Sequence, residues 1–362
     1  MIFRLLDTGK ISAAANMALD KIILEETASL HSPPTLRFLQ FKPAAALVGY
    51  HQDVDLEIRS DYCRAHGIDV NRRHTGGGSI FFQESGLGWE LFGIPGEEPF
   101  LGPYEDILHQ ICSIAASALS RCGIRATFRP RNDIEVDGRK ISGTGGVTIS
   151  GGFMFQGTIL VKNEVDVFLR ALRVPVEKLK KREIESLMER ICFLSDLVDP
   201  CPSTGAVKQH LADEFACKLG VRMEHGDLTL REKTRLCEEL PYFEGPEWIT
   251  SRFRPDCEGE PIRSITQTSA GTLRVHLWLG PGGRRVRQAL VAGDFFTIPG
   301  RLVHDLEAAL VGVRAEPSAL KTAVIGFFQQ YDGQVLGIDP DRIARAVAAA
   351  GERLLLVEQD FS

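Results

Sequence analysis

Apolar residues recur along this chain with two different periods. Spacing by three and four residues is typical of amphipathic helices, whereas alternation, or a short apolar run bounded by turn residues, is typical of strands. The helices expected from the first pattern cover residues 12–26, 107–122, 206–219, 302–311 and 341–353. The strands expected from the second cover residues 36–39, 45–48, 79–82, 158–161, 273–279 and 285–291. Because both patterns occur in both halves of the chain, the sequence predicts an α+β (mixed α/β) fold.

An Asp-Gly pair at residues 137–138 gives the sharpest local prediction. It divides an alternating segment that runs from residue 133 to residue 142, and it is the strongest short-range signal for a β-hairpin. Alternation around a two-residue turn places four polar side chains on one face, namely Asp133, Glu135, Lys140 and Ser142. One interpretation is that this face carries the polar side chains of a functional site. The other is an ordinary exposed hairpin in which Glu135 and Lys140 form a weak ion pair.

Two arginines and three glycines stand close together in the segment Arg72-Arg73-His74-Thr75-Gly76-Gly77-Gly78. Glycine lets backbone N–H groups approach a ligand closely, and arginine supplies a permanent charge and a planar donor fork that suits phosphate or carboxylate. The segment is therefore a candidate anion-binding loop. A glycine turn flanked by solvated arginines is the alternative interpretation.

The composition limits the classes of function. The 362 residues are enough for two domains, and a hydrophobic fraction of 44% with a charged fraction of 25% is ordinary for a globular protein. The net charge of −6 argues against a nucleic-acid partner, and no apolar run is long enough to cross a bilayer. The eight cysteines lack any Cys-x-x-Cys pair, so we expect reduced, mostly packed thiols in a cytoplasmic protein and no structural zinc.

A proline-containing stretch of low periodicity covers residues 241–261 and is typical of a linker. It predicts two domains, one covering residues 1–247 and a smaller α/β accessory domain covering residues 258–362. Trp248, inside this stretch, is expected either to pack against the first domain or to be an ordinary linker aromatic. His276 stands in an alternating segment, which marks it as a strand residue and not as a metal ligand.

Several short motifs together resemble those of the lipoate-protein ligase A family, in the larger biotin and lipoate ligase superfamily. They occur in the family's order: Asn16-Met17-Ala18-Leu19-Asp20, Val48-Gly49-Tyr50-His51-Gln52, Arg72 to Gly78, Arg131-Asn132-Asp133, Gly138 to Gly143, Gly157-Thr158-Ile159-Leu160 and Gly293-Asp294-Phe295-Phe296. Each motif alone is weak, but the combination is specific and spans nearly the whole chain. The resemblance implies a biotin/lipoate protein ligase-like catalytic domain followed by a small accessory domain.

The resemblance also implies an enzyme that uses ATP to activate lipoate or octanoate as an acyl-adenylate and then transfers the acyl group to a lysine of an acceptor protein. Carboxylate attack on a phosphate brings anions together, so cations and oriented amides are needed where charge accumulates. Lys140 is the implied catalytic residue, which binds the acyl carbonyl and the phosphate. The implied adenylate- and lipoate-binding residues are Arg73, Thr75, Gly76, Gly77, Gly78, Asn132, Lys140, Gly145 and Thr158. Asp133 is the implied ligand of Mg²⁺.

The implied partner is a lipoate-accepting protein. It is a lipoyl domain of a 2-oxoacid dehydrogenase, the glycine-cleavage H protein, or an H-protein-like lipoate carrier, and no nucleic-acid or membrane partner is expected. The chain departs from the family at two places, where many members read His-Asp and this chain has Phe82-Gln83, and where they read His-His-Gly-Thr and it has Phe155-Gln156-Gly157-Thr158. These changes predict a more apolar pocket wall and leave open the base that serves the acceptor lysine.

Other classes of function remain open. A lipoyl or octanoyl transferase of the same superfamily would use a cysteine thioester in place of ATP, although residues 132–161 contain no cysteine. A non-catalytic lipoate-binding protein would have lost turnover through the changes at Phe82 and Gln83. Biotin ligase is less favoured, because its glycine-rich site differs in order. A P-loop protein is set aside, since no Gly-x-x-x-x-Gly-Lys-Ser/Thr motif occurs.

Overall fold

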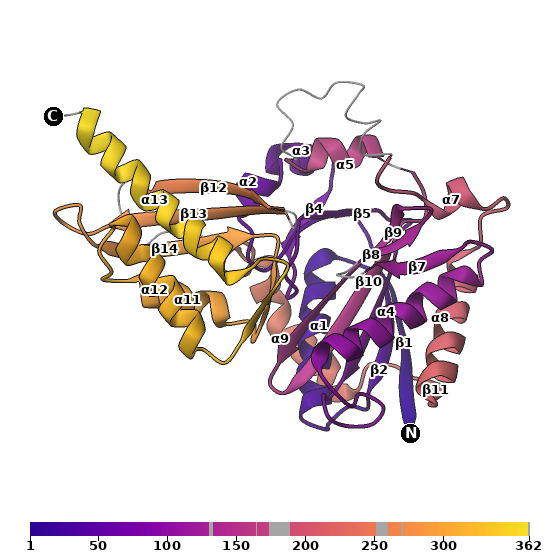
Figure 1. The fold of residues 1–362 in the computed structure, drawn as a ribbon. Helices are drawn as coiled ribbons and strands as arrows, with labels where there is room; N and C mark the ends of the chain where they lie inside the picture. Colours follow the sequence, from indigo (N-terminus) through magenta and orange to yellow (C-terminus); the bar gives the residue numbers. More distant parts are fainter. Residues whose placement is uncertain (130–132, 164, 174–188, 251–259, 269–270, 361–362) are drawn as a thin grey trace. The chain divides into compact units, whose positions relative to one another are not determined.

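The computed structural model describes residues 1–129, 133–163, 165–173, 189–250, 260–268 and 271–360. The chain forms two compact units (Figure 1). The first consists of Met1–Leu47, Asp55–His74 and Ile80–Ile249. The second consists of Val48–Val54, Thr75–Ser79 and Thr250–Ser362. Two short segments that interrupt the first unit in the sequence therefore belong to the second.

An eight-stranded sheet is the centre of the first unit. Its strands lie in the order β11 (Arg222–His225), β1 (Ile2–Ile11), β2 (Thr35–Phe41), β6 (Leu87–Gly93), β10 (Gly152–Ile159), β9 (Arg139–Ile149), β8 (Asp133–Val136) and β7 (Ala126–Arg129). β11 and β2 run parallel to β1, and the pairings from β2 across to β7 are antiparallel. A second, three-stranded sheet has the order β4 (Asp69–Arg72), β3 (Ala45–Val48) and β5 (Ile80–Phe82).

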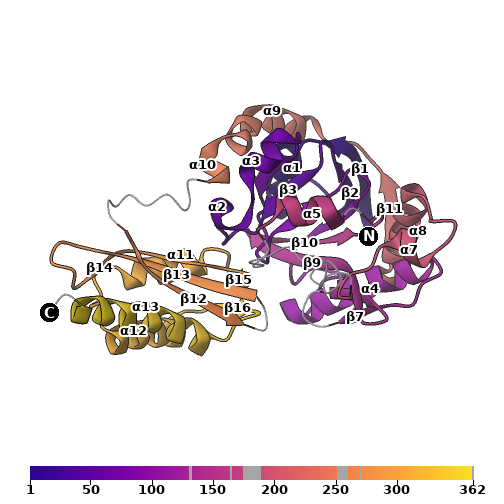
Figure 2. The same cartoon turned by 90° about the horizontal axis from the view of Figure 1, so that it is seen from above.

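Helices cover both faces of the large sheet (Figure 2). One face carries α4 (Tyr104–Ser120) and α8 (Thr204–Leu219), which share the main core with Phe38, Trp89 and Phe155. The other face carries α1 (Ala13–Ala28) and α9 (Leu230–Glu244), which pack around Phe92 and Met154. Consecutive residues of a strand point to opposite faces, so neighbours in the sequence serve different helix layers. The remaining helices of this unit are short: α2 (Val54–Glu57), α3 (Ser60–Ala65), α5 (Val165–Ala171), α7 (Leu194–Leu197) and α10 (Pro246–Ile249).

Polar side chains fix the helix ends on the α1 and α9 side. Ser12 caps α1 by accepting a hydrogen bond from the Ala15 N–H at 3.2 Å. Thr229 and Glu232 form a reciprocal capping box at the start of α9. Glu232 also accepts two hydrogen bonds from the Arg4 guanidinium on β1, both at 2.7 Å. The buried Arg4–Glu232 ion pair therefore holds α9 against β1, which lies next to the edge strand β11.

The second unit has a core of its own. It contains an antiparallel sheet of β12 (Ile262–Thr268), β13 (Gly271–Leu279) and β14 (Val286–Gly293), and a short pair of β15 (Phe296–Ile298) with β16 (Gln334–Leu336). Its helices are α11 (Leu302–Leu310), α12 (Pro317–Gln330) and α13 (Pro340–Asp360). Val275, Leu306 and Val347 are among the side chains that these elements bury together.

The mixed α/β fold class is confirmed, and the expected helices and strands are present. The strand expected at 158–161 is the end of the longer β10, and β1, β11, α9 and α12 were not predicted. The expected linker begins too early, because residues 241–249 complete α9 and form α10. Trp248 is buried in the first unit, where its indole N–H lies 3.0 Å from both Asn71 Oδ1 and the Arg72 carbonyl. In the described part of the chain, no helix is both long and apolar enough to cross a membrane.

The Asp-Gly hairpin is present, with a correction to its register. Asp137 and Gly138 have φ values of 49° and 76°, as a type I′ turn requires, and Glu135 pairs with Lys140 as expected. Beyond that pair a bulge shifts the register, so that Ile134 lies opposite Ser142 and Asp133 opposite Gly143. Ser142 is buried and does not share the polar face. Its predicted position is wrong because a bulge inserts a residue that alternation does not reveal.

Candidate functional site

Strand pairing aligns two rows of residues on the face of the large sheet that α1 covers. The first row runs across β2, β6, β10 and β9 and consists of Arg37, Glu90, Gln156 and Gly145. The second row lies two residues further along each strand and consists of Leu39, Gly88 and Thr158. A two-residue step along a strand is about 7 Å. The two rows therefore offer a floor long enough for an extended chain of several methylene groups.

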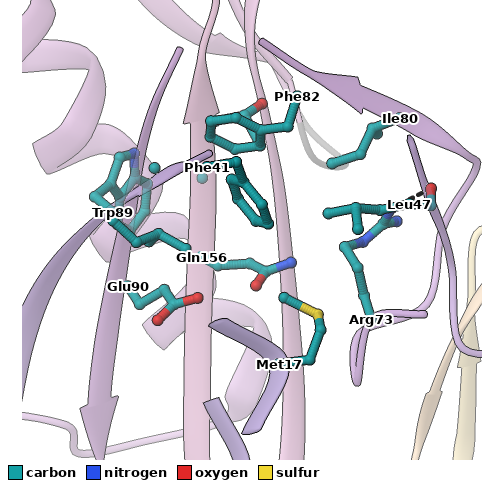
Figure 3. Close-up of a pocket in the computed structure, with 13 residues that line it drawn as sticks. Met17, Phe41, Leu47, Arg73, Ile80, Phe82, Trp89, Glu90 and Gln156 are labelled. Atoms are coloured by element: carbon teal, nitrogen blue, oxygen red, sulfur yellow. Dashed lines mark hydrogen bonds between the residues drawn. The ribbon is translucent and has the colours of Figure 1, made fainter. Parts of the chain in front are cut away.

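A pocket of about 280 Å³ lies over these rows (Figure 3). Met17 of α1 and Leu47 and Ile80 of the three-stranded sheet contribute to its walls. Phe41 and Phe82, whose ring centroids are 4.5 Å apart, add an aromatic side. The polar side chains that line it are Arg73, Glu90, Gln156 and Thr158. Small-molecule sites are mostly apolar with a few polar groups, and the lining of this pocket has that character.

A buried charged cluster adjoins the inner wall of the pocket. Arg37 donates from Nη1 to Asp20 Oδ1 at 2.7 Å and to Glu90 Oε2 at 2.9 Å, and from Nη2 to Asn16 Oδ1 at 2.6 Å. Burial raises the pKa of Glu90 well above its usual range, and the nearby charge of Asp20 raises it further. Burial also raises the pKa of Asp20, against the opposing effect of Arg37. Two carboxyl groups share one guanidinium, so a proton is favoured on one of them.

Lys140 lies beside Thr158, which lines the pocket. Its Nζ forms an ion pair with Asp133 Oδ1 at 2.7 Å. A Cβ atom at Gly143 would lie 2.9 Å from Lys140 Cε and Nζ and 3.8 Å from Thr158 Oγ1. The ammonium and the hydroxyl therefore lie on the same side of Gly143, and the missing side chain at this position leaves the space that the lysine occupies.

The ion pair expected between Glu135 and Lys140 is replaced by two others. Glu135 pairs with Arg129 Nε at 3.0 Å, while Lys140 pairs with Asp133. The bulge explains the exchange, because it moves Gly143 opposite Asp133 and changes which side chains meet across the hairpin. The interpretation as an ordinary exposed Glu135–Lys140 pair is therefore wrong.

The surroundings of Asp133 do not form a magnesium site by themselves. Its carboxylate already faces Lys140 at 2.7 Å and Arg129 Nη2 at 3.5 Å. Among the residues that the structure describes, no group of three or more His, Cys, Asp or Glu side chains could hold a metal ion. Mg²⁺ commonly takes one or two carboxylates and completes its shell with water and phosphate oxygens. The role of Asp133 as a metal ligand stays a prediction.

The two arginines of the candidate anion loop are both buried, so the interpretation as a solvated turn is wrong. Arg73 lines the pocket, and its Nη1 donates to the Leu47 carbonyl at 3.2 Å. Arg72 holds the end of the first unit, since it donates to the carbonyls of Trp248 and Ile249 at 3.3 and 2.9 Å. Only Arg73 is therefore placed to meet a ligand in the pocket.

Thr75, Gly76, Gly77 and Gly78 belong to the second unit. There the Gly77 N–H donates to the Phe295 carbonyl at 3.2 Å, and a Cβ atom at Gly76 would lie 2.1 Å from the same oxygen. These glycines permit a close backbone approach to the Gly293–Phe296 motif. Their expected role in adenylate binding stays a prediction. Asn132, the other expected adenylate contact, lies outside the described residues.

Glu90 is a pocket residue that the sequence analysis did not identify. The available signal was a carboxylate in the middle of the apolar segment Leu87–Gly93, because a charge in a buried strand must be paired. Trp89, Leu39 and Leu47 also line the pocket, but nothing in their spacing distinguishes them from ordinary core residues. Gln156 had been noted only as a departure from the family motif.

Two buried cysteines lie close to β9. Cys112 Sγ donates to Thr144 Oγ1 at 3.4 Å, and Cys192 Sγ donates to the Arg139 carbonyl at 3.4 Å. Burial raises the pKa of Cys112 to about 12 and also raises that of Cys192. A thiol with a raised pKa is a poor nucleophile at neutral pH. None of the cysteines in the described ranges is among the residues that line the pocket.

Residues 12–216 match the family described as the lipoyl protein ligase A/B catalytic domain. The chain therefore belongs to the lipoyl protein ligase A/B family, as the motifs had indicated. It is similar to lipoate-protein ligase LplJ of Bacillus subtilis, with 24% identity over 322 residues that cover 87% of this chain and 92% of the relative. It is also similar to octanoyltransferase LipM of Moorella thermoacetica, with 24% identity over 269 residues that cover 69% of this chain and 98% of the relative.

Two solved structures show the same fold. P. falciparum LipL1 in complex with lipoate has a TM-score of 0.73 and 16% identity, and the match covers 95% of this chain and 98% of that one. A lipoate-protein ligase A bound with ATP has a TM-score of 0.59 and 22% identity, and the match covers 68% of this chain and 98% of that one. The family thus contains both ligases and octanoyltransferases, and family membership alone does not choose between them.

Proposed function

We propose that this protein is an ATP-dependent lipoate-protein ligase. It activates lipoate or octanoate as an acyl-adenylate and transfers the acyl group to one lysine of an acceptor, which is a lipoyl domain, a glycine-cleavage H protein or an H-like carrier. The observation that carries the proposal is the Lys140 ammonium beside Thr158, a residue that lines a mostly apolar pocket. A cation there can bind the carboxylate of a chain that lies in the pocket.

Activation of the acid by ATP requires fixed positive charge where the carboxylate attacks the α-phosphate. Lys140, with Arg73 in the pocket wall, can supply it, and the loss of a positioned donor of this kind typically slows a reaction by about 10²–10³. Asp133 holds the Lys140 ammonium at 2.7 Å and so limits its freedom before substrate binds. ATP is a substrate of this reaction and is consumed to adenylate and pyrophosphate.

A transferase that moves an octanoyl group from a thioester is the second candidate, because LipM is among the similar proteins. Such an enzyme needs a reactive thiol at the site. The raised pKa values of Cys112 and Cys192 count against both as nucleophiles, which favours the ligase.

Pyrophosphate release separates the two functions. A ligase releases pyrophosphate only when ATP and lipoate are both present, and hydroxylamine traps the activated acyl group. A transferase modifies the acceptor from an octanoyl thioester without ATP and releases none. Acceptor modification from the thioester together with no ATP-dependent pyrophosphate release would reject the ligase proposal.

Lys140→Ala is expected to lower acceptor modification by about 10²–10³, since one charged donor at the reacting centre is lost. The melting temperature should change little, because the side chain is partly exposed and outside the core. Arg129→Ala is the matched control, as it removes another cation that contacts Asp133, from the neighbouring strand β7. Activity near the wild-type rate in Lys140→Ala, or an equal loss in Arg129→Ala, would contradict the assignment.

We further propose that the second unit acts as a lid for activation and is less important for transfer. An acyl-adenylate must be shielded from water until the acceptor arrives. A chain truncated after Ile249 keeps Trp248 and the hydrophobic clusters on both faces of the large sheet, so it should fold. It should form lipoyl-adenylate poorly and still transfer the acyl group from lipoyl-adenylate that is supplied ready-made. Activation at the full rate by the truncated chain would show that the second unit has another role.

A further inference from the structure

The two ends of the pocket differ in chemistry. Near Thr158, the floor consists of Leu39 and Gly88, and Phe82 packs close above Gly88. One row away, about 7 Å along the strands, the floor consists of Glu90 and Gln156. Figure 3 shows the Glu90 carboxyl group directed toward Gln156. A purely hydrocarbon ligand would be served better by an apolar residue at each of these positions.

The polar end is built into the core and is not a chance surface feature. Glu90 is 1% exposed, and its Oε2 is held by Arg37, which is also held by Asp20 and Asn16. Gln156 is the direct cross-strand partner of Glu90, on the same face of the sheet. Strand register therefore places both residues on this face, and the charged cluster fixes the Glu90 carboxyl group before any ligand enters.

A saturated chain gains little from contact with amide and carboxyl groups, because it has no atom that can form a hydrogen bond with them. Divalent sulfur is polarisable and accepts weak hydrogen bonds. If the carboxylate of the ligand lies by Lys140 and Thr158, the far part of an eight-carbon chain reaches the row of Glu90 and Gln156. A dithiolane ring at that place presents two sulfur atoms to the polar wall, whereas octanoate presents a methyl group.

We infer that Glu90, with Gln156, is a specificity-determining residue that selects acyl groups with sulfur or other polarisable, weakly accepting atoms near their far end over plain saturated chains. The inference rests on the proposed function in one respect, that the pocket receives the acyl chain. It does not depend on how the acid is activated.

Calorimetric titration of the full-length protein with free (R)-lipoate and with octanoate tests the inference without ATP. The wild type should bind lipoate about tenfold more tightly than octanoate, the size of discrimination that small differences in a pocket typically give. In Glu90→Leu the two affinities should become nearly equal, mainly because octanoate binds more tightly. Glu90→Gln keeps a polar group of the same shape and should keep the preference. Arg37 retains Asp20 and Asn16 in both variants, so each should fold.

Gln156→Leu gives a second measurement on the same wall and should shift the preference in the same direction, even if Glu90→Leu fails to fold. Equal affinities in the wild type, no binding of either acid, or an unchanged preference in a folded Glu90→Leu or Gln156→Leu would overturn the inference. Pyrophosphate release is measured in parallel. Its absence with the expected binding preference would reject the ligase activity and leave the role of Glu90 standing.

Discussion

The two faces of the large sheet are made by alternate residues of the same strands, yet they differ sharply. The face under α4 and α8 is apolar, and its strand side chains include Phe3, Leu36, Phe38, Trp89, Leu91, Phe153 and Phe155. The face under α1 and α9 mixes apolar residues with the buried charged residues Arg4, Arg37 and Glu90 and with the half-buried Gln156. The first face mainly fills the core, although Trp89 also lines the pocket. The second combines a core with a pocket.

The buried charges of the second face are paired, as buried ions must be. Arg4 binds Glu232, and Arg37 binds Asp20 and Glu90. Buried ion pairs are weak evidence for stability, because desolvation cancels much of their attraction. The Arg37 cluster, whose Glu90 lines the pocket, is therefore better explained by function than by folding. Gln156 therefore belongs to the site, whereas its neighbour Phe155 belongs to the core of the other face.

The adjacent residues Phe155 and Gln156 should show the largest difference in stability between the two faces. Phe155→Ala should lower the free energy of unfolding by about 3–5 kcal/mol, because it leaves a cavity in the main core. Gln156→Ala should change it by about 1 kcal/mol or less and should instead alter lipoate binding. Urea denaturation and calorimetric titration measure the two effects. Similar losses of stability in both variants would show that the two faces are equally structural.

Arg37→Met tests whether the charged cluster is integral to the second face. The change leaves Asp20 and Glu90 together without their cation, and breaking a buried pair typically costs 3–5 kcal/mol. We expect the lower end, about 3 kcal/mol, since both carboxyl groups already have raised pKa values and can take up protons. The variant should consequently be more stable at mildly acidic pH than at pH 8. A loss under about 1 kcal/mol at neutral pH would contradict this account.

Local signals in the sequence predicted the elements that carry the site. The Asp137-Gly138 turn placed Lys140 on a hairpin because the turn type depends on only two residues. Ser12 marked the start of α1, and the helical spacing of the apolar residues after it indicated the length of the helix. These predictions succeeded because each depends on neighbours in the chain.

Features that depend on distant residues could not be predicted. β1 pairs in parallel with β11, about two hundred residues away in the sequence, and neither strand was expected. Pro241 was taken as a linker signal, but it stands inside α9 near its C-terminal end. The bulge beside Ile134 and the burial of Glu90 are likewise set by packing, so alternation alone gave the wrong neighbour for Asp133 and gave no warning of a polar pocket wall.

The grouping of Thr75–Ser79 with the second unit is another non-local feature. The sequence placed Arg73 and the three glycines in one loop, and the structure places Arg73 in the pocket wall of the first unit. Gly76 approaches the Phe295 backbone so closely that a side chain there would collide with it. Nothing in the glycine run itself indicated that partner.

The Arg4–Glu232 pair gives the smallest expected effect and separates a structural ion pair from the functional Arg37 cluster. It lies on the second face but is not among the residues that line the pocket. Although burial alone would raise the pKa of Glu232, the hydrogen bonds and charge of Arg4, with those from Thr229 and Ser32, lower it below the ordinary value of 4.5. A carboxyl group with a lowered folded-state pKa contributes stability above its unfolded pKa, and that contribution is lost as the pH falls through the folded pKa.

We expect the double variant Arg4→Met/Glu232→Gln, which removes both charges, to change stability at pH 7 by only about 1 kcal/mol. Its stability should fall less steeply than that of the wild type below about pH 4.5, by at most about 1.4 kcal/mol per pH unit for one proton. Urea denaturation at a series of pH values measures both quantities, and lipoate binding at pH 7 should be unchanged. If the double variant follows the wild-type acid dependence, or loses lipoate binding while folded, charge on this face cannot be divided into a structural pair and a functional cluster.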